Sequence, residues 1–295
     1  MSTILAPTAP AGWRAWLLTD TPRSATQARL GQAYGSWLAF RANPMALVGL
    51  AIVLLLILAA ALAPWLAPQS PIAQDLAQRL QPPSAAHWLG TDELGRDIYS
   101  RIVWGSRITL TIVALVAVIV GPVGLLVGTV AGYAGGWLDT ILMRVTDIFL
   151  AFPPLLLAIL LVAVLGGGFS SAVLALAIAW WPFYAVLVRG QVVSVRRLPF
   201  IEAAHATGAP PLRIAWRHLL PNALGPLLVQ ATVDIGAVIL VASGLSFIGL
   251  GPQPPTADWG LMIASGRQFV LSGSWWVAGF PGLAILVTAL AFAMV

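Results

Sequence analysis

The amino-acid sequence predicts an all-α membrane protein with six transmembrane helices. Of its 295 residues, 59% are hydrophobic and 8% are charged, and the mean hydropathy is +0.91. Charged residues make up about a quarter of an ordinary soluble domain, so this composition indicates a membrane protein. The few charges are separated by apolar runs, several of which reach the roughly 20 residues that a helix needs to cross a bilayer.

The crossings are placed by the gaps between charged residues, because an ionised side chain at the centre of a bilayer costs about 2.5 to 3.5 kcal/mol. The charge-free run between Asp147 and Arg189 is about twice as long as one crossing needs, and the triplet Gly166–Gly168 inside it predicts a hairpin. We expect crossings within 44–68, 107–139, 147–166, 168–189, 224–244 and 275–295. The last run is still apolar at Val295, which predicts a short polar tail beyond it.

The distribution of arginine predicts the orientation, since short cytoplasmic loops accumulate positive charge. Four arginines lie in 1–43 and five lie in 189–222, so both segments are expected in the cytoplasm. The chain then divides into a cytoplasmic N-terminal segment 1–43, a first transmembrane helix 44–68, an extracytoplasmic loop 69–106, and a core 107–295 of five transmembrane helices.

Several classes of function are disfavoured by residue types that are missing. All 15 basic side chains are arginine, and without lysine the chain cannot form a Walker-type phosphate loop. Cysteine is absent, and the histidines His87, His205 and His218 lack the spacing of a metal site. The charges flank apolar runs instead of forming a basic stripe. We therefore expect no catalytic residues, no metal or other cofactor in this chain, and no nucleic-acid partner.

The segment 189–222 is too polar to cross a membrane and has the shape of a docking element. We expect a short helix through Glu202, a turn over Gly208–Pro211, and a second helix that starts at Leu212 and is ended by Pro221. Small side chains around Glu202 expose the backbone to a partner, and glycine at 208 permits a tight reversal.

The residues of this loop carry a resemblance. The pattern E-A-A-x-x-x-G followed by L-P occupies Glu202, Ala203, Ala204, Gly208, Leu220 and Pro221. It resembles the coupling loop of bacterial binding-protein-dependent ABC importer permeases. The resemblance implies a type I importer permease fold in which the loop's short helix, a coupling helix, docks on a separate ATPase subunit.

Three further segments are similar to the second, six-helix (C-type) permease of the dipeptide, oligopeptide and nickel group. They are H-W-L-G-T-D-E-L-G-R-D at 87–97, M-R-V-T-D at 143–147, and the stretch from G-L-S-F-I-G-L-G at 244–251 to P-P and W-G at 254–260. The resemblance implies a non-enzymatic permease subunit in the bacterial inner membrane. Its implied partners are a homologous permease, two subunits that bind ATP and Mg²⁺, an extracytoplasmic solute-binding protein and membrane lipid. The implied cargo is a dipeptide or oligopeptide, with a nickel chelate as the alternative.

Three acidic positions have individual predictions. Asp147 stands three residues after Arg144, so the two are expected to pair on one helix face. Asp234 lies midway along the fifth crossing and is a candidate either for the translocation pathway or for a contact to the partner permease. Asp234 also leaves open an ion-coupled secondary transporter, and a membrane scaffold is a third possibility. Asp92 is expected to cap a helix that begins at Glu93 and runs along the outer surface to Trp104.

Overall fold

The computed structural model describes residues 12–19, 21–22 and 24–295. Within these ranges the protein is helical, and the only bridge between extended residues is an isolated antiparallel pair, Thr91 and Asp97. The predicted all-α class is confirmed. Part of the predicted N-terminal segment 1–43, namely residues 1–11, 20 and 23, lies outside the described residues.

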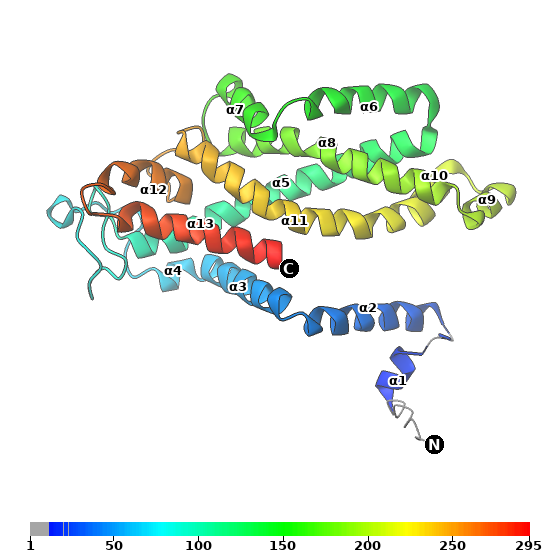
Figure 1. Ribbon diagram of the computed structural model, residues 1–295, viewed down its shortest axis with the longest axis horizontal. Helices are drawn as coiled ribbons and strands as arrows, with labels where there is room; N and C mark the ends of the chain where they lie inside the picture. The colour runs from blue at the N-terminus through cyan, green and yellow to red at the C-terminus, as the bar shows by residue number, and fades with distance from the viewer. Residues whose placement is uncertain (1–11, 20, 23) are drawn as a thin grey trace, which may run out of the picture.

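The helices follow one another along the whole described chain (Figure 1). Their bounds are α1 Trp13–Leu17, α2 Ala25–Ala42, α3 Pro44–Ala61, α4 Ala63–Leu66, η1 Leu76–Gln78, α5 Ile98–Ala134, α6 Gly136–Leu150, α7 Pro154–Leu165, α8 Phe169–Arg196, α9 Pro199–Ala206, α10 Pro211–Ile214, η2 Ala215–Leu219, α11 Leu220–Phe247, α12 Trp259–Gly266, η3 Arg267–Phe269 and α13 Trp276–Met294.

Among the described residues, five helical stretches are long and apolar enough to cross a membrane. They are α3, α5, α8, the continuous stretch Pro211–Phe247 that ends in α11, and α13. A sixth crossing is reached only if α6 and α7 form one span, and these two helices are bent by 87° at their junction. The count of six is consistent with this upper limit, and the expected third crossing then contains a sharp bend. Pro153 and Pro154 cannot continue a regular helix from α6, which explains the break.

Helices α5 and α8 pack side by side in the centre of the bundle, and small residues on α5 allow this close approach. A Cβ atom added to Gly128 would lie 2.5 Å from the carbonyl oxygen of Ala185, and one added to Gly124 would lie 2.3 Å from the Cβ atom of Tyr184. Side chains at these positions would push the two helices apart. Helices α11 and α13 complete the bundle, and α3 packs on α13 and α5.

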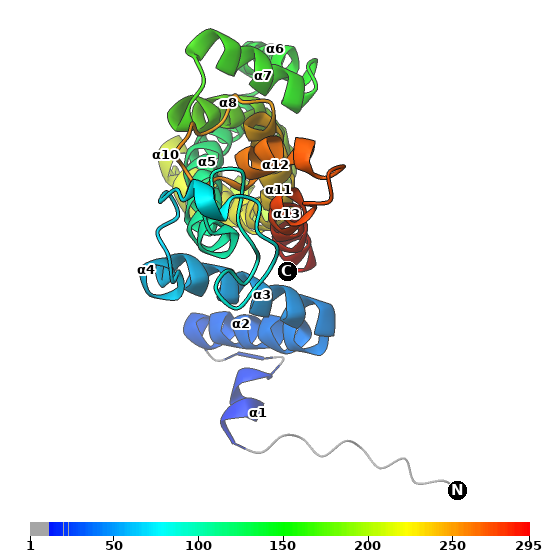
Figure 2. The ribbon, with the colours of Figure 1, turned by 90° about the vertical axis from the view of Figure 1, so that its left-hand side faces the viewer.

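The bundle has two ends of different construction (Figures 1 and 2). We call the end that carries 67–97, 248–258 and α12 the loop end, and the end that carries α9 and α10 the coupling end. Helices α1 and α2 stand away from the bundle on the coupling-end side of α3 (Figure 1). The side-chain oxygen of Asn43 accepts hydrogen bonds from the backbone N–H groups of Met45 and Ala46, so α2 and α3 meet at a capped helix start.

At the loop end, the predicted helix start at Glu93 was wrong. Helix α5 begins at Ile98, and Asp97 caps it by accepting a hydrogen bond of 2.8 Å from the backbone N–H of Ser100. Asp92 instead holds a tight turn, in which Oδ1 accepts from the backbone N–H groups of Leu94 and Arg96. Gly95 in this turn has φ +73°, a conformation that ends a helix, so the helix cannot start before it.

At the coupling end, Pro221 does not terminate the second helix. The chain runs from α10 through the π-helical turn η2 directly into α11, where Pro221 occupies the first turn. A proline lacks the backbone N–H that a regular helix needs. The π turn just before Pro221 already interrupts the regular hydrogen bonds of the helix, so the missing N–H is tolerated there. The amide of Asn222 donates to the carbonyl oxygen of His218 at 2.6 Å and satisfies one of the carbonyl groups there.

Candidate functional site

The predicted docking element is a helical elbow at the coupling end, formed by α9, the turn 207–210 and α10. Helix α9 ends in a Schellman motif. The N–H of Ala209 donates to the carbonyl of Ala204 at 3.1 Å, and the N–H of Gly208 donates to that of His205 at 2.9 Å. Gly208 has φ +74°, which only glycine adopts without strain. The reversal is therefore encoded locally by the sequence.

One face of the elbow is fastened to the bundle. Ile201 on α9, Ile214 on α10 and Leu219 just beyond it are completely buried. Ala204 and Ala209 pack against the same hydrophobic core. These apolar anchors give the elbow a defined position relative to the ends of α8 and α11.

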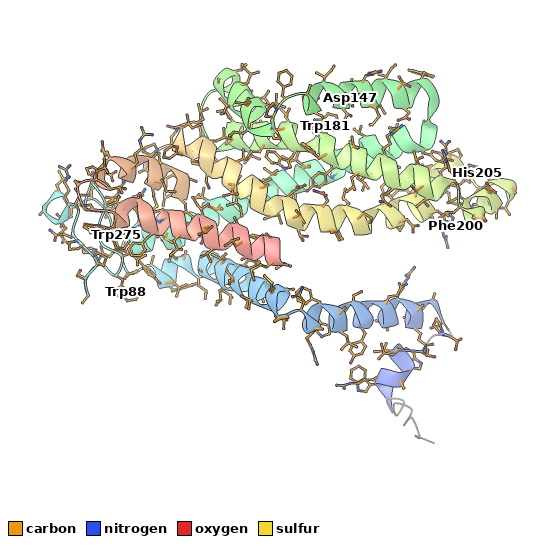
Figure 3. All side chains as sticks on the ribbon, in the orientation of Figure 1. Trp88, Asp147, Trp181, Phe200, His205 and Trp275 are labelled. Carbon is orange, nitrogen blue, oxygen red and sulfur yellow. The ribbon has the colours of Figure 1, made fainter. Side chains whose placement is uncertain are left out.

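The opposite face is open to solvent and combines apolar and basic side chains. Glu202, Ala203 and Gly208 are exposed, as the docking hypothesis requires. Large apolar side chains are exposed in and next to the elbow, namely Leu198, Phe200, Leu212 and Trp216, with Leu212 70% and Trp216 66% exposed. Arg197, Arg213 and Arg217 in the same segments are exposed too. Exposed apolar side chains interspersed with charged ones are typical of a protein-binding surface. Phe200 and His205 lie at the far end of the molecule in Figure 3.

Helix α8, which leads into the elbow, is bound to neighbouring helices by two of its arginines. The guanidinium of Arg196 donates to the carbonyl oxygens of Gly132 at 3.3 Å and Tyr133 at 2.8 Å, which closes the C-terminal end of α5. Arg189 makes a two-pronged ion pair with Asp139 on α6, with both N···O distances 2.6 Å. Fifty residues separate Arg189 from Asp139, and no spacing rule in the sequence connects them.

The other two signature residues, Leu220 and Pro221, lie in the first turn of α11, beyond the elbow. Leu220 is half-buried and Pro221 is exposed. Their place is at the joint between the π turn and the transmembrane helix. They are therefore not part of the elbow's exposed face, and they connect it to α11.

Asp234 lies inside this chain, between α5, α8 and α11. Its Oδ1 atom accepts a hydrogen bond of 3.0 Å from Gln230, one turn earlier on α11. Its Oδ2 atom is buried without a hydrogen bond, and Tyr184 on α8 lines the same small space. A small cavity of about 10 Å³ adjoins the carboxyl group, with Val116 and Trp180 among its lining residues. This is about the space of a single water molecule. The role of Asp234 in a pathway stays a prediction.

Arg144 and Asp147 share a face of α6, with Nη1 and Oδ2 3.9 Å apart. Their side chains are 80% and 59% exposed, so this contact contributes little to stability. Figure 3 shows Asp147 on the outer side of α6. The pair is a surface feature of the broken crossing.

At the loop end, charged side chains that the sequence reasoning treated separately form one buried network. Arg96 pairs with Asp92 at 2.7 Å and with Glu93 at 3.1 Å, and Nε of Arg101 lies 3.6 Å from Asp92. Arg101 also donates to the carbonyl oxygens of Pro71 at 2.8 Å and Thr256 at 3.4 Å. It thereby connects the two loops of this end to α5.

The histidine of the same motif belongs to a neighbouring cluster. His87 lies with Nδ1 3.1 Å from Oδ1 of Asp97, the residue that caps α5. Trp276 at the start of α13 donates to the carbonyl oxygen of Thr91 at 3.3 Å. The polar motif at 87–97 therefore holds the loop end together through its side chains.

Comparison with known proteins agrees with this architecture. The sequence model of the family described as "Binding-protein-dependent transport system inner membrane component" matches residues 124–295. The chain belongs to this family of ABC importer permeases. The model described as "N-terminal TM domain of oligopeptide transport permease C" matches residues 32–83 of the permease. The predicted resemblance is thus confirmed, and the permease is a multi-pass protein of the bacterial inner membrane.

Characterised relatives resemble the permease over most of its length. The probable D,D-dipeptide transport system permease protein DdpC of Escherichia coli strain K12 is 44% identical over 93% of this chain and 91% of its own. The dipeptide transport system permease protein DppC of Bacillus subtilis strain 168 is 40% identical over 89% and 82%. The nickel transport system permease protein NikC of Escherichia coli strain K12 is 41% identical over 84% and 89%.

Proposed function

We propose that the permease forms half of the translocation pathway of an importer for dipeptides or oligopeptides and that its elbow couples this pathway to a separate ATPase subunit. The observation that supports coupling best is the two-faced elbow. Its inner face is anchored by Ile201 and Ile214, and its outer face presents Glu202 and Ala203 to solvent. A partner that pushes on the outer face would move the ends of α8 and α11 together.

Binding of the ATPase is supported by the chemistry of the exposed face. Leu212 and Trp216 can enter an apolar cleft, while Arg213 and Arg217 can pair with acidic residues at its rim. The ATP and Mg²⁺ are held by two such ATPase subunits, and the permease itself performs no covalent chemistry. With cytoplasmic ATPase subunits bound at the elbow, the coupling end and the N-terminal segment face the cytoplasm, as the arginine distribution predicts.

The remaining partners follow from the type of importer. A homologous permease forms the other half of the pathway, and an extracytoplasmic binding protein delivers the solute to the loop end. A peptide cargo is supported by the relatives that are described as dipeptide permeases, at 40% to 44% identity. A nickel chelate is the second candidate because NikC is 41% identical.

The coupling role is tested by Glu202→Lys in the reconstituted importer. Glu202 is exposed, so the charge reversal leaves the fold intact and disturbs only the surface that meets the ATPase. We expect peptide uptake to fall at least tenfold while the ATPase subunits still hydrolyse ATP. Arg79→Glu, a charge reversal at an exposed position of the loop end, is the matched control. Normal uptake with Glu202→Lys would refute the coupling role.

The cargo is tested by uptake into vesicles that contain the complete importer. We expect ATP-dependent accumulation of a labelled dipeptide that unlabelled dipeptides inhibit and nickel chelates do not. The reverse pattern would replace the peptide by nickel. Uptake without ATP that is abolished by Asp234→Asn would instead favour the ion-coupled transporter.

A further inference from the structure

Arg107, near the loop end of α5, is an exposed cation that pairs with no carboxylate of the described residues. The ion pairs of the described residues do not include it. Its guanidinium carbon lies 5.0 Å from the ring centre of Trp104, one turn earlier on the same helix. Arg107 stands where the charge-free part of α5 begins, at the boundary of the membrane.

Two cavities meet at Arg107. The first, of about 590 Å³, lies between Trp104, Ile108 and the loop segments 70–72 and 256–257. The second is an open groove of about 350 Å³ between the end of α3 and the adjoining part of α5. Arg107 and Thr111 line both of them. We call these two adjoining cavities, which share Arg107 and Thr111 as lining residues, the recess.

The groove between α3 and α5 runs from the charged end toward the apolar interior. Beyond Arg107 its lining consists of Ala60, Ala61, Leu110, Thr111, Ala114 and Leu115. The hydroxyl of Thr111 donates to the carbonyl oxygen of Arg107 at 2.6 Å, so it is already engaged. From Arg107 to Leu115 the helix advances by about 12 Å, at 1.5 Å per residue. The groove thus begins at a basic side chain and continues along α5 over mainly apolar ones.

We propose that this recess binds an anionic phospholipid, with the phosphate paired to Arg107 and one acyl chain in the groove between α3 and α5. Arginine matches phosphate oxygens with two parallel hydrogen bonds, and Trp104 supplies the aromatic neighbour common at headgroup level. No carboxylate is among the residues that line either cavity. This site is separate from the coupling elbow and from the transported solute, so it goes beyond the proposed function.

The proposal is tested by native mass spectrometry of the purified importer complex, stripped of lipid and titrated with phosphatidylglycerol. We expect Arg107→Gln to lower the affinity of one bound lipid at least tenfold, because the variant loses the positive charge and the paired hydrogen bonds to the phosphate. Arg79→Gln is the matched control, because Arg79 is an exposed arginine of the same end that lines neither cavity. Its lipid binding is expected to equal that of the unchanged complex.

A second variant tests the acyl-chain groove independently of charge. Ala114 is exposed to the groove, so Ala114→Phe fills the groove without disturbing the core and is expected to remove the same bound lipid. Unchanged phosphatidylglycerol binding in Arg107→Gln would overturn the proposal. Equal affinity for phosphatidylcholine, or displacement of the lipid by free inorganic phosphate, would also overturn it. The same holds if the complex binds no such lipid because the partner permease covers the groove.

Discussion

The two ends of the permease are stabilised by opposite kinds of contact. At the loop end Asp92, Arg96 and Arg101 are each at most 6% exposed, and both arginines pair with Asp92. At the coupling end the buried side chains are apolar, and the charged residues of the elbow face solvent.

This difference suggests a division of mechanical roles. A buried charge network has few good arrangements, because every displaced partner leaves a charge uncompensated. Apolar anchors such as Ile201 are non-directional and tolerate small shifts at little cost. We infer that the loop end is the fixed part of the permease and that the coupling end is the part that can follow a moving partner.

The largest loss of stability is expected from a substitution at Arg101, which connects the two loops of the loop end to α5. Arg101→Met removes the guanidinium that donates to the carbonyl oxygens of Pro71 and Thr256 and lies beside Asp92. At about 1.5 to 3 kcal/mol for each hydrogen bond to a charged group, the expected cost is about 3 to 5 kcal/mol of stability. The measurement is thermal unfolding in detergent, followed by tryptophan fluorescence. Arg79→Met, at an exposed position of the same end, should change stability by less than about 0.5 kcal/mol. Equal unfolding temperatures for both variants would show that the network does not hold the loop end.

Shortening a buried side chain of the elbow should destabilise the elbow locally. Ile201 is completely buried, so Ile201→Ala should cost about 2 to 5 kcal/mol of elbow packing. Because α9 lies at the tip of the bundle, the expected result is proteolysis within 199–210 at least tenfold faster, with little change in global unfolding. Leu212→Ala, at an exposed position, is the control. Global unfolding at a much lower temperature would mean that the whole bundle depends on the elbow for its stability.

A substitution of Gly208 tests the backbone conformation of the turn, and its expected effect on stability is smaller. Gly208→Ala forces a residue with a Cβ atom into φ +74°, which costs about 1 to 2 kcal/mol although no atom lies within 4 Å of the added carbon. Proteolysis of the turn is expected to increase about five- to tenfold. Gly244→Ala within α11 also meets nothing within 4 Å and has no positive φ, so it should be neutral or slightly stabilising.

The smallest effect is expected on α6. Arg144→Ala removes an exposed contact of 3.9 Å and should change stability by no more than about 0.5 kcal/mol. Asp139→Asn disrupts the two-pronged pair with Arg189 and should cost more. Thermal unfolding of the two variants side by side measures the difference. A larger loss for Arg144→Ala would mean that the isolated chain underestimates the burial of α6 in the assembled importer.

Local signals in the sequence predicted the elements that depend only on nearby residues. The glycine triplet 166–168 separates α7 from α8, and the elbow contains the expected short helix and the reversal at Gly208. Predictions of helix ends failed where a local rule met a tertiary constraint. Pro221 was expected to stop a helix, but the helix accommodates it after a π turn. Asp92 was expected to cap a helix, but the network with Arg96 and Arg101 uses it in a turn.

By itself, the sequence determined that this chain is a helical membrane protein, that it carries the signature of an importer permease, and where most crossings lie. These properties depend on hydropathy and on motifs of neighbouring residues, which a linear pattern records. Only the tertiary structure decided that Arg189 meets Asp139, that Arg101 connects two loops, and that Arg107 sits between two cavities. These contacts join residues far apart in the chain, and their geometry is fixed by the packing of whole helices.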